Sequence, residues 1–296
     1  MGLNLPTANA IDTQIKRAFD AFGLSVKVGT QRIFYQSIRK FRKKPQERRK
    51  TTANLALTIY AIKELNGNSP SPACIWKAVR NLDIPKNIRG FLWKNLHEAY
   101  KIGDFWLNVP NYENRGNCPL CGETESMPHI LLECEKSTAI VTVWKAASTL
   151  WNLREESWPT IKYGTILGSN LVKFKDEEGK NLPGKNRLFN IIVTESAHLL
   201  WKLRCERTIK FDNDAEKYHS EREIYNRWLS TMNRRLKLDR ILTDKNKFGR
   251  KAIDEKLVLR TWSGTLDNEE NLPDNWCRQS GVLVGMAPLR PPGRNR

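Results

Sequence analysis

Residues 118–134 read C-P-L-C-G-E-T-E-S-M-P-H-I-L-L-E-C, and the organisation of the chain is best understood outward from them. Cys118, Cys121, His129 and Cys134 form a Cys-x2-Cys-x7-His-x4-Cys quartet. Three thiolates and one imidazole are the ligands of a tetrahedral structural Zn2+, and they leave no position for water or substrate. The spacing therefore predicts a structural zinc site. The alternative is three buried cysteines and a surface histidine.

The residues between the four ligands predict a local shape. Pro119 and Gly122 suit a tight turn that brings Cys118 and Cys121 onto one metal. Ser126 and Pro128 are typical of the start of a short helix that carries His129. Five residues from His129 to Cys134 are slightly too many for one face of an α-helix, so we expect this helix to end or loosen before Cys134.

Helical spacing dominates on both sides of the quartet. Apolar residues recur at helical intervals, and capping residues, Gly or Pro mark the ends. Helices are expected at 53–65, after the Ser-Pro repeat at 69–72, from Asp83 onward with Ile88 on the buried face, and at 137–153, 186–209, 216–242 and 251–262. A shorter one is expected at Ile11–Phe22. The predicted fold class is mainly α: a helical domain stapled by a Cys3His zinc knuckle, followed by a second helical bundle region.

Breaks in composition suggest five segments. Gly, Pro and charged residues gather at 154–184, and the last residues have the composition of disorder. We expect a partly flexible basic linker at 1–50, a zinc-bearing helical domain at 51–153, a linker at 154–184, a helical region at 185–265 and a mostly disordered tail at 266–296.

A strong positive charge favours a polyanionic partner. The 296 residues carry 50 Lys and Arg against 32 Asp and Glu, a net charge of +18. Each neutralised phosphate releases counterions, so such a chain favours nucleic acid. No apolar run is long enough for a membrane span, no signal peptide is visible, and the three cysteines outside the quartet are an odd number for a disulfide framework. We expect a reduced, intracellular protein with no membrane partner.

Two basic segments are the predicted nucleic-acid contacts. Residues 39–50 and 234–251 each carry eight Lys or Arg, and the first also reads as a solvated linker. The candidate residues are Arg39, Lys40, Arg42, Lys43, Lys44, Arg48, Arg49, Lys50, Arg234, Arg235, Lys237, Arg240, Lys245 and Lys247. Trp228, Tyr225 and Phe248 are candidates for base stacking or, equally, for the core.

The knuckle itself is not expected to hold a phosphate backbone. Residues 118–135 contain four glutamates and no Lys or Arg, and Glu123 and Glu125 are two of them. Three thiolates around Zn2+ leave a further negative charge. We expect the Glu123→Gln and Glu125→Gln changes to leave the fold intact, and the zinc to hold helices together while basic segments bind.

Catalysis has little support in the sequence. A two-metal nuclease needs carboxylates that converge on one cleft, and Asp104, Glu195, Asp239 and Asp254 follow no recognisable spacing. His97 and His198 are expected to be packing residues rather than general bases. No phosphate-binding loop, nucleophile elbow or dinucleotide fingerprint is present. We expect a protein that is not an enzyme.

Residues 75–151 resemble the reverse-transcriptase zinc-binding domain found behind the polymerase in LINE-type retrotransposons. The resemblance is carried by Ile75-Trp76-Lys77, I-P-K-N-I-R-G-F-L-W-K-N-L at 84–96, Gly103, the quartet, and Val143-Trp144. Further along, E-S-A-H-L-L-W-K-L-R-C-E-R at 195–207 and V-L-R-T-W-S-G at 258–264 resemble the C-terminal tail of fungal LINE polyproteins with an RNase H domain.

This resemblance implies nucleic-acid binding during target-primed reverse transcription. It also implies the same four zinc ligands, a nuclear location, and the reverse transcriptase and RNase H part of the element as a partner. The polymerase and RNase H motifs are absent from this chain, which is similar to the tail alone. The competing hypothesis is a structural or protein-interaction module that zinc folds and that has no direct nucleic-acid role.

Overall fold

The computed structural model describes residues 30–41, 48–155 and 157–291, with the side chains of Ser37, Lys40 and Phe41 left out. The helix predicted at Ile11–Phe22 and the candidates Arg42, Lys43 and Lys44 lie outside the described residues. The chain divides into two compact units, Met1–Arg48 and Arg49–Arg296. In the first, α2 (Gln31–Phe41) is a helix within the stretch predicted as a linker.

The second unit is built of helices, and 63% of the residues that the structure describes are helical. In its first half lie α3 (Arg49–Asn66), α4 (Pro72–Val79), α5 (Lys86–Leu96) and α7 (Thr138–Asn152). Ser71 caps α4 by accepting a hydrogen bond from the Cys74 amide, and Ser137 caps α7 in the same way from Ile140. These are the helices that the spacing predicts, and the mainly α fold class is confirmed.

The second half contains the long helices α9 (Pro183–Cys205) and α10 (Glu221–Leu242) and the shorter α12 (Glu255–Trp262). Short helical turns connect them and the first half: α6 (Asp104–Leu107), α8 (Tyr163–Gly168), α11 (Lys245–Phe248), the 3-10 turns η1 (Glu113–Gly116), η3 (Ser169–Leu171), η5 (Ala215–Lys217), η6 (Gly249–Lys251), η7 (Glu269–Asn271) and η8 (Trp276–Arg278), and the π-helical turns η2 (His129–Glu133) and η4 (Glu206–Lys210).

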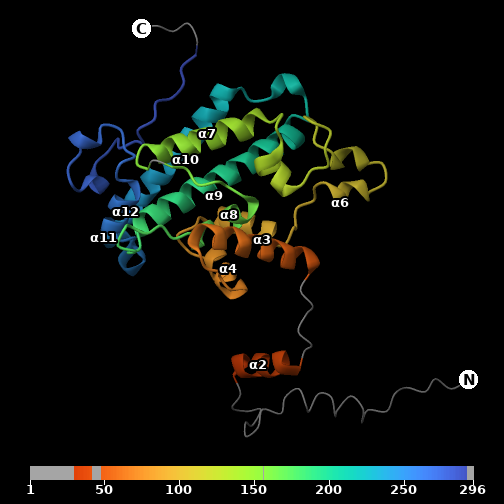
Figure 1. The fold of residues 1–296 in the computed structure, drawn as a ribbon, viewed down its shortest axis with the longest axis horizontal. Helices are drawn as coiled ribbons and strands as arrows, with labels where there is room; N and C mark the ends of the chain where they lie inside the picture. The colour runs from red at the N-terminus through yellow and green to blue at the C-terminus, as the bar shows by residue number, and fades with distance from the viewer. Residues whose placement is uncertain (1–29, 42–47, 156, 292–296) are drawn as a thin grey trace, which may run out of the picture. The chain divides into compact units, whose positions relative to one another are not determined.

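Helix α9 is the centre of the core (Figure 1). It is buried on most of its circumference, and it packs against α7, α10, α12 and the π-helical turn η2. Buried residues lie on most sides of α9, as expected for a helix at the centre of a core. Because α7 and η2 belong to the first half, the core of the two halves is continuous through α9.

The predicted linker at 154–184 is part of this packed core. Helix α8 lies against α3, and its glycines allow the close contact: a Cβ on Gly164 would lie 2.2 Å from the Leu57 carbonyl oxygen. Phe174 packs its ring on Trp151 and Phe189, with ring centroids 5.2 and 5.3 Å apart. The composition that suggested a linker reflects close packing, so the predicted boundaries at 153 and 185 do not separate units.

The predicted disordered tail is also ordered over most of its length. Leu266 pairs with Val284 in an isolated antiparallel bridge, and Trp276 and Val282 are buried. The apolar residues of this segment are isolated among Gly, Pro and Asn, and η8 packs on α10 and α12. Helical periodicity does not reveal such isolated contacts. Residues 292–296 lie outside the described part of the chain.

A buried ion-pair network joins the two halves. The Arg187 guanidinium of α9 donates to both carboxylate oxygens of Asp239 at 2.6 and 2.9 Å, and to Asp83 at 2.7 and 2.9 Å. Trp262 Nε1 donates to Asp239 at 2.9 Å. Burial opposes ionisation of Asp239, but the charge of Arg187 and its hydrogen bonds prevail and lower the pKa of Asp239. Asp83 belongs to the first half and Asp239 to the second, so this network fixes one to the other.

Candidate metal centre

The first two ligands come from a tight turn. Asn117 and Thr124 form an antiparallel bridge at its base, and the Cys118 amide donates to the Glu123 carbonyl at 2.7 Å. Gly122 donates back to the Cys118 carbonyl at 2.8 Å and has φ +82°, a left-handed conformation that glycine adopts without strain. This is the turn that the Cys-x2-Cys-Gly pattern predicts.

The other two ligands lie at the ends of a π-helical turn. The Ser126 hydroxyl accepts a hydrogen bond from the His129 amide at 3.1 Å, and the Cys134 amide donates to the His129 carbonyl at 3.1 Å. An α-helix would turn these two side chains about 140° apart, whereas the wider i→i+5 turn brings them to one face. The expected loosening of the helix is therefore a single π turn, η2.

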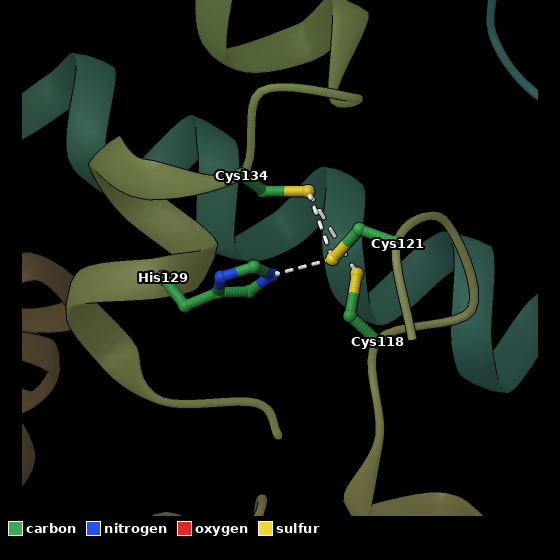
Figure 2. A group of neighbouring side chains, drawn as sticks. All are labelled: Cys118, Cys121, His129 and Cys134. Carbon is green, nitrogen blue, oxygen red and sulfur yellow. Dashed lines mark hydrogen bonds between the residues drawn. The ribbon is translucent and has the colours of Figure 1, made fainter. Parts of the chain in front are cut away.

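The four side chains converge on one point (Figure 2). Cys134 Sγ lies 3.8 Å from both Cys118 Sγ and Cys121 Sγ, and Cys121 Sγ lies 3.4 Å from His129 Nε2. Bonds to Zn2+ of about 2.3 Å for sulfur and 2.0 Å for nitrogen give tetrahedral edges of about 3.8 Å and 3.5 Å. All four donor atoms lie within 4.8 Å of one another, so they fit a single tetrahedral ion.

The surroundings favour a bound cation. Burial, and then the neighbouring Cys118 thiol, raise the pKa of Cys134 to about 12. Three thiolates so close together are therefore stable only around a positive ion. Cys118, His129 and Cys134 are buried, and four protein donors complete a tetrahedron. The arrangement holds a structural metal and offers no coordination position for a substrate.

A second ion pair attaches the knuckle to α9. Glu125 is buried, and Arg204 of α9 binds both of its carboxylate oxygens, through Nη2 and, at 3.2 Å, through Nε. Arg207 adds a longer contact at 3.5 Å. Gly103, which precedes α6, packs against the backbone of Glu125: a Cβ there would fall 1.9 Å from the Glu125 carbonyl oxygen. The sequence reasoning missed Arg204, because its partner is 79 residues away and no local pattern connects them.

This ion pair corrects the expectation for the knuckle glutamates. Glu125 does not project a free charge toward a ligand, and its change to Gln would leave Arg204 buried without its carboxylate. Glu123, Glu133 and Glu135 are exposed. The expectation that both substitutions spare the fold assumed free surface charges, and for Glu125 the structure contradicts that assumption.

Within the second unit, the predicted basic contacts do not form one surface. Figure 1 shows the start of α3, where Arg49 and Lys50 lie, and α11, which carries Lys245 and Lys247, at opposite ends of the second unit. Lys50 forms an ion pair with Glu98. Arg39 and Lys40 lie in α2, and Arg48 is the last residue of the first unit.

Within α10, the candidates differ in exposure. Arg234 and Lys237 are exposed, whereas Arg240 is half-buried and donates to the Cys277 carbonyl at 3.2 Å. Arg235 is buried, donates to the Asp83 carbonyl at 2.8 Å and lies 3.3 Å from Asp239. Because its charge is already neutralised inside the core, Arg235 is a structural residue and not a phosphate contact.

The aromatic candidates divide in the same way. Trp228 is fully buried and donates to the Ser196 hydroxyl at 2.8 Å, so it belongs to the core and is not available for stacking. Tyr225 is half-buried and donates to the Ala287 carbonyl at 3.1 Å. Phe248 is half-buried beside Lys247, whose ammonium lies 5.7 Å from the ring centroid.

The two histidines that were expected to be packing residues rather than general bases have aromatic neighbours. His97 stacks on Trp76 at 5.0 Å between ring centroids and meets Trp93 at 4.4 Å. His198 packs against Phe91, and burial, followed by the nearby charges of Lys202 and Arg234, lowers its pKa to about 4. In the described part of the chain, no helix has the length and apolarity that a membrane crossing requires.

Comparison with known protein families supports a zinc site at the four ligands. Residues 58–144 match the family model described as zinc-binding in reverse transcriptase. This segment contains all four ligands, together with α4, α5 and the first turns of α7. The matched module is an accessory zinc-binding domain and not a catalytic one. No curated protein and no solved structure matches the chain.

Proposed function

We propose that this chain is a non-catalytic, zinc-dependent nucleic-acid-binding module of the LINE retrotransposon type, which contacts DNA or RNA during target-primed reverse transcription. The observation that supports it most is a complete Cys3His quartet inside the segment that matches the reverse-transcriptase zinc-binding family. The likeness of residues 195–207 and 258–264 to fungal LINE tails extends the proposal to the second half of the chain.

Zn2+ is the metal that we assign to the quartet. Three thiolates with one imidazole suit zinc better than the oxygen-preferring Mg2+ or Ca2+, and the donor distances fit its tetrahedral geometry. Elemental analysis of the purified chain is expected to give one zinc per chain. The Cys134→Ser variant is expected to give much less, whereas Cys74→Ser, a change at an exposed cysteine outside the quartet, should retain the metal.

Nucleic acid is the proposed partner because of charge. The net charge is +18, and exposed Lys and Arg remain on α2, α3, α10 and α11 after the buried ion pairs are set aside. The proposed role also places the protein in the nucleus, beside the reverse transcriptase and RNase H part of an element. A fluorescent fusion and co-purification with that part would test these two points.

Salt dependence of binding tests the proposal against a purely structural module. Labelled single-stranded RNA, single-stranded DNA and duplex DNA are titrated from about 50 to 200 mM salt. Contact with about six phosphates predicts slopes of log K against log salt of about −4 for single strands and −5 for duplex. Weak binding whose affinity does not change with salt concentration would instead support a protein-interaction module whose folding depends on zinc.

A further inference from the structure

A polar groove runs between α9 and α10 on the second unit. Its volume is about 590 Å³, and four basic residues line it: Lys202 from α9 and Arg222, Arg227 and Arg234 from α10. The two helices are held side by side in the core beneath, where Trp228 Nε1 donates to Ser196 at 2.8 Å. This contact holds the two walls of the groove together, and the basic side chains of the groove come from two helices that are separate in the sequence.

Three of these four cations have no carboxylate partner. Arg227 is held by Glu206 through two hydrogen bonds of 2.6 and 2.7 Å. Within residues 48–155 and 157–291, no carboxylate lies at ion-pair distance from Lys202, Arg222 or Arg234. By contrast, Arg187, Arg204 and Arg235 are all paired in the core. The fold neutralises the buried arginines and leaves the groove positive.

The unpaired charges also repel one another. Burial is the main cause that lowers the pKa of Lys202, and the charge of Arg234 is the second. Three acids lie nearby. Glu195 is buried and Glu206 binds Arg227, whereas Glu223 lines the groove and lies 2.6 Å from His219 Nδ1. An anion in the groove would relieve the repulsion between Lys202 and Arg234. Against the four basic side chains, the groove lining has one carboxylate, Glu223, which is held by His219.

The spacing along α10 suits an extended anion better than a single ion. Arg227, Ser230 and Arg234 follow one another at i, i+3 and i+7, so they lie on one face over about 10 Å. Ser230 is exposed between the two arginines and adds a hydroxyl donor. A phosphodiester backbone presents charges repeatedly along such a length, whereas an isolated phosphate would use only one end.

We propose that the α9–α10 groove is a binding site for the phosphodiester backbone of nucleic acid, with Lys202, Arg222 and Arg234 as its principal contacts. The inference deepens the proposed function and rests on it. It differs from the sequence-based assignment in two ways: it adds Lys202 and Arg222, and it removes Arg235, the neighbour of Arg234 that points into the core.

The test compares two pairs of charge-neutralising substitutions in the full chain with zinc. Lys202→Gln with Arg234→Gln removes two groove charges. Lys173→Gln with Lys175→Gln removes two exposed charges near the start of α9, about 28 Å along the helix from Lys202. The probe is a labelled single-stranded RNA oligonucleotide, and thermal unfolding verifies the fold of each variant.

Loss of two phosphate contacts is expected to weaken binding about 25-fold at about 0.1 M salt and to flatten the salt slope by about 1.4. The Lys173 and Lys175 pair should change affinity much less. Ser230→Glu, which removes no native contact, should also weaken binding, and the charge-retaining Lys202→Arg with Arg234→Lys should keep the salt slope.

Distinct results would overturn the two proposals. If the unmodified chain binds with a salt slope and the groove pair matches the Lys173 and Lys175 pair, the groove is wrong and the proposed function stands. If the unmodified chain shows no salt-dependent binding of any nucleic acid, both are wrong. Competition by inorganic phosphate or anionic phospholipid vesicles, as strong as by unlabelled RNA at equal phosphate, would also overturn the groove as a nucleic-acid site.

Discussion

At the residue scale, adjacent side chains of the same type have opposite roles. Arg234 is exposed on the groove, and Arg235 is buried between Asp83 and Asp239. One step along an α-helix rotates the side chain by about 100°, which is enough to move it from solvent to core. The two side chains are chemically identical, and the rotation along the helix gives them different environments.

Arg235→Gln is expected to lower the free energy of unfolding by about 3 kcal/mol, because it leaves buried Asp239 and half-buried Asp83 with less positive charge. Arg234→Gln should change it by less than about 0.5 kcal/mol and weaken nucleic-acid binding instead. Denaturant unfolding and RNA titration of both variants measure this. Equal stability of the two variants would contradict the buried role of Arg235.

The knuckle glutamates offer a second matched pair. Glu125→Gln removes the carboxylate that binds buried Arg204, so we expect a loss of about 3 kcal/mol in the free energy of unfolding. Glu123→Gln removes an exposed charge and keeps the backbone contact with Cys118, so stability should be unchanged within about 0.5 kcal/mol. Denaturant unfolding of the zinc-loaded variants measures both free energies. A Glu125→Gln protein as stable as the unmodified chain would contradict a stabilising role of the Glu125–Arg204 ion pair.

At the scale of elements, the π-helical turn η2 is the feature on which the metal geometry depends. Trp144 of α7 supports it by donating from Nε1 to the Leu131 carbonyl at 2.8 Å. A hydrogen bond of this kind contributes about 1 kcal/mol, and a π turn needs support because its own packing is poorer than that of an α-helix.

Trp144→Phe keeps the ring and removes the donor. We expect a decrease in zinc affinity of about fivefold, the equivalent of about 1 kcal/mol, measured by competition with a chelator. Trp106→Phe is the control: its Nε1 donates to the Lys101 carbonyl at 2.8 Å, outside the metal-binding turn, so zinc affinity should not change. The idea fails if the two variants lose zinc equally.

At the scale of the whole molecule, the two helical halves share one core. Helix α7 buries Val143, Leu150 and Trp151 against α9 and α10, and α8 packs on α3. Each large apolar side chain contributes about 1.5–3 kcal/mol by leaving water. A fragment that ends at residue 153 would expose all of these contacts at once.

The fragment 49–153 is therefore expected not to fold on its own, even with zinc, whereas 49–291 should fold. Far-UV circular dichroism and amide dispersion in NMR spectra of the two fragments provide the comparison. A well-dispersed spectrum for 49–153 would show that the zinc domain is independent, as the sequence-based boundaries predict.

Removal of the metal should affect both halves together. Zinc binding to a small knuckle has an apparent free energy of about 10–16 kcal/mol, which equals or exceeds the stability of a typical domain. Because Glu125 and Arg204 connect the knuckle to α9, chelation is expected to lower helicity and tryptophan burial in one transition. If hydrogen exchange showed a loss of amide protection that is confined to residues 58–144, this expectation would be contradicted.

Sequence alone determined the features that depend on local spacing. The Cys3His quartet, the turn at Gly122, and the helices around Ile88 and Trp144 were all predictable, because ligand spacing, capping and helical periodicity act within a few residues of the chain. The mainly α fold and the four candidate ligands follow from these patterns.

Only the tertiary structure decided which charges are neutralised and which are available. Glu125 meets Arg204 across 79 residues, and Arg235 meets Asp83 across 152. The apparent linker before α9 became core because glycines and aromatic rings there touch distant helices. Such contacts depend on how helices pack, which local propensity does not encode, and the groove beside Lys202 and Arg234 follows from that packing.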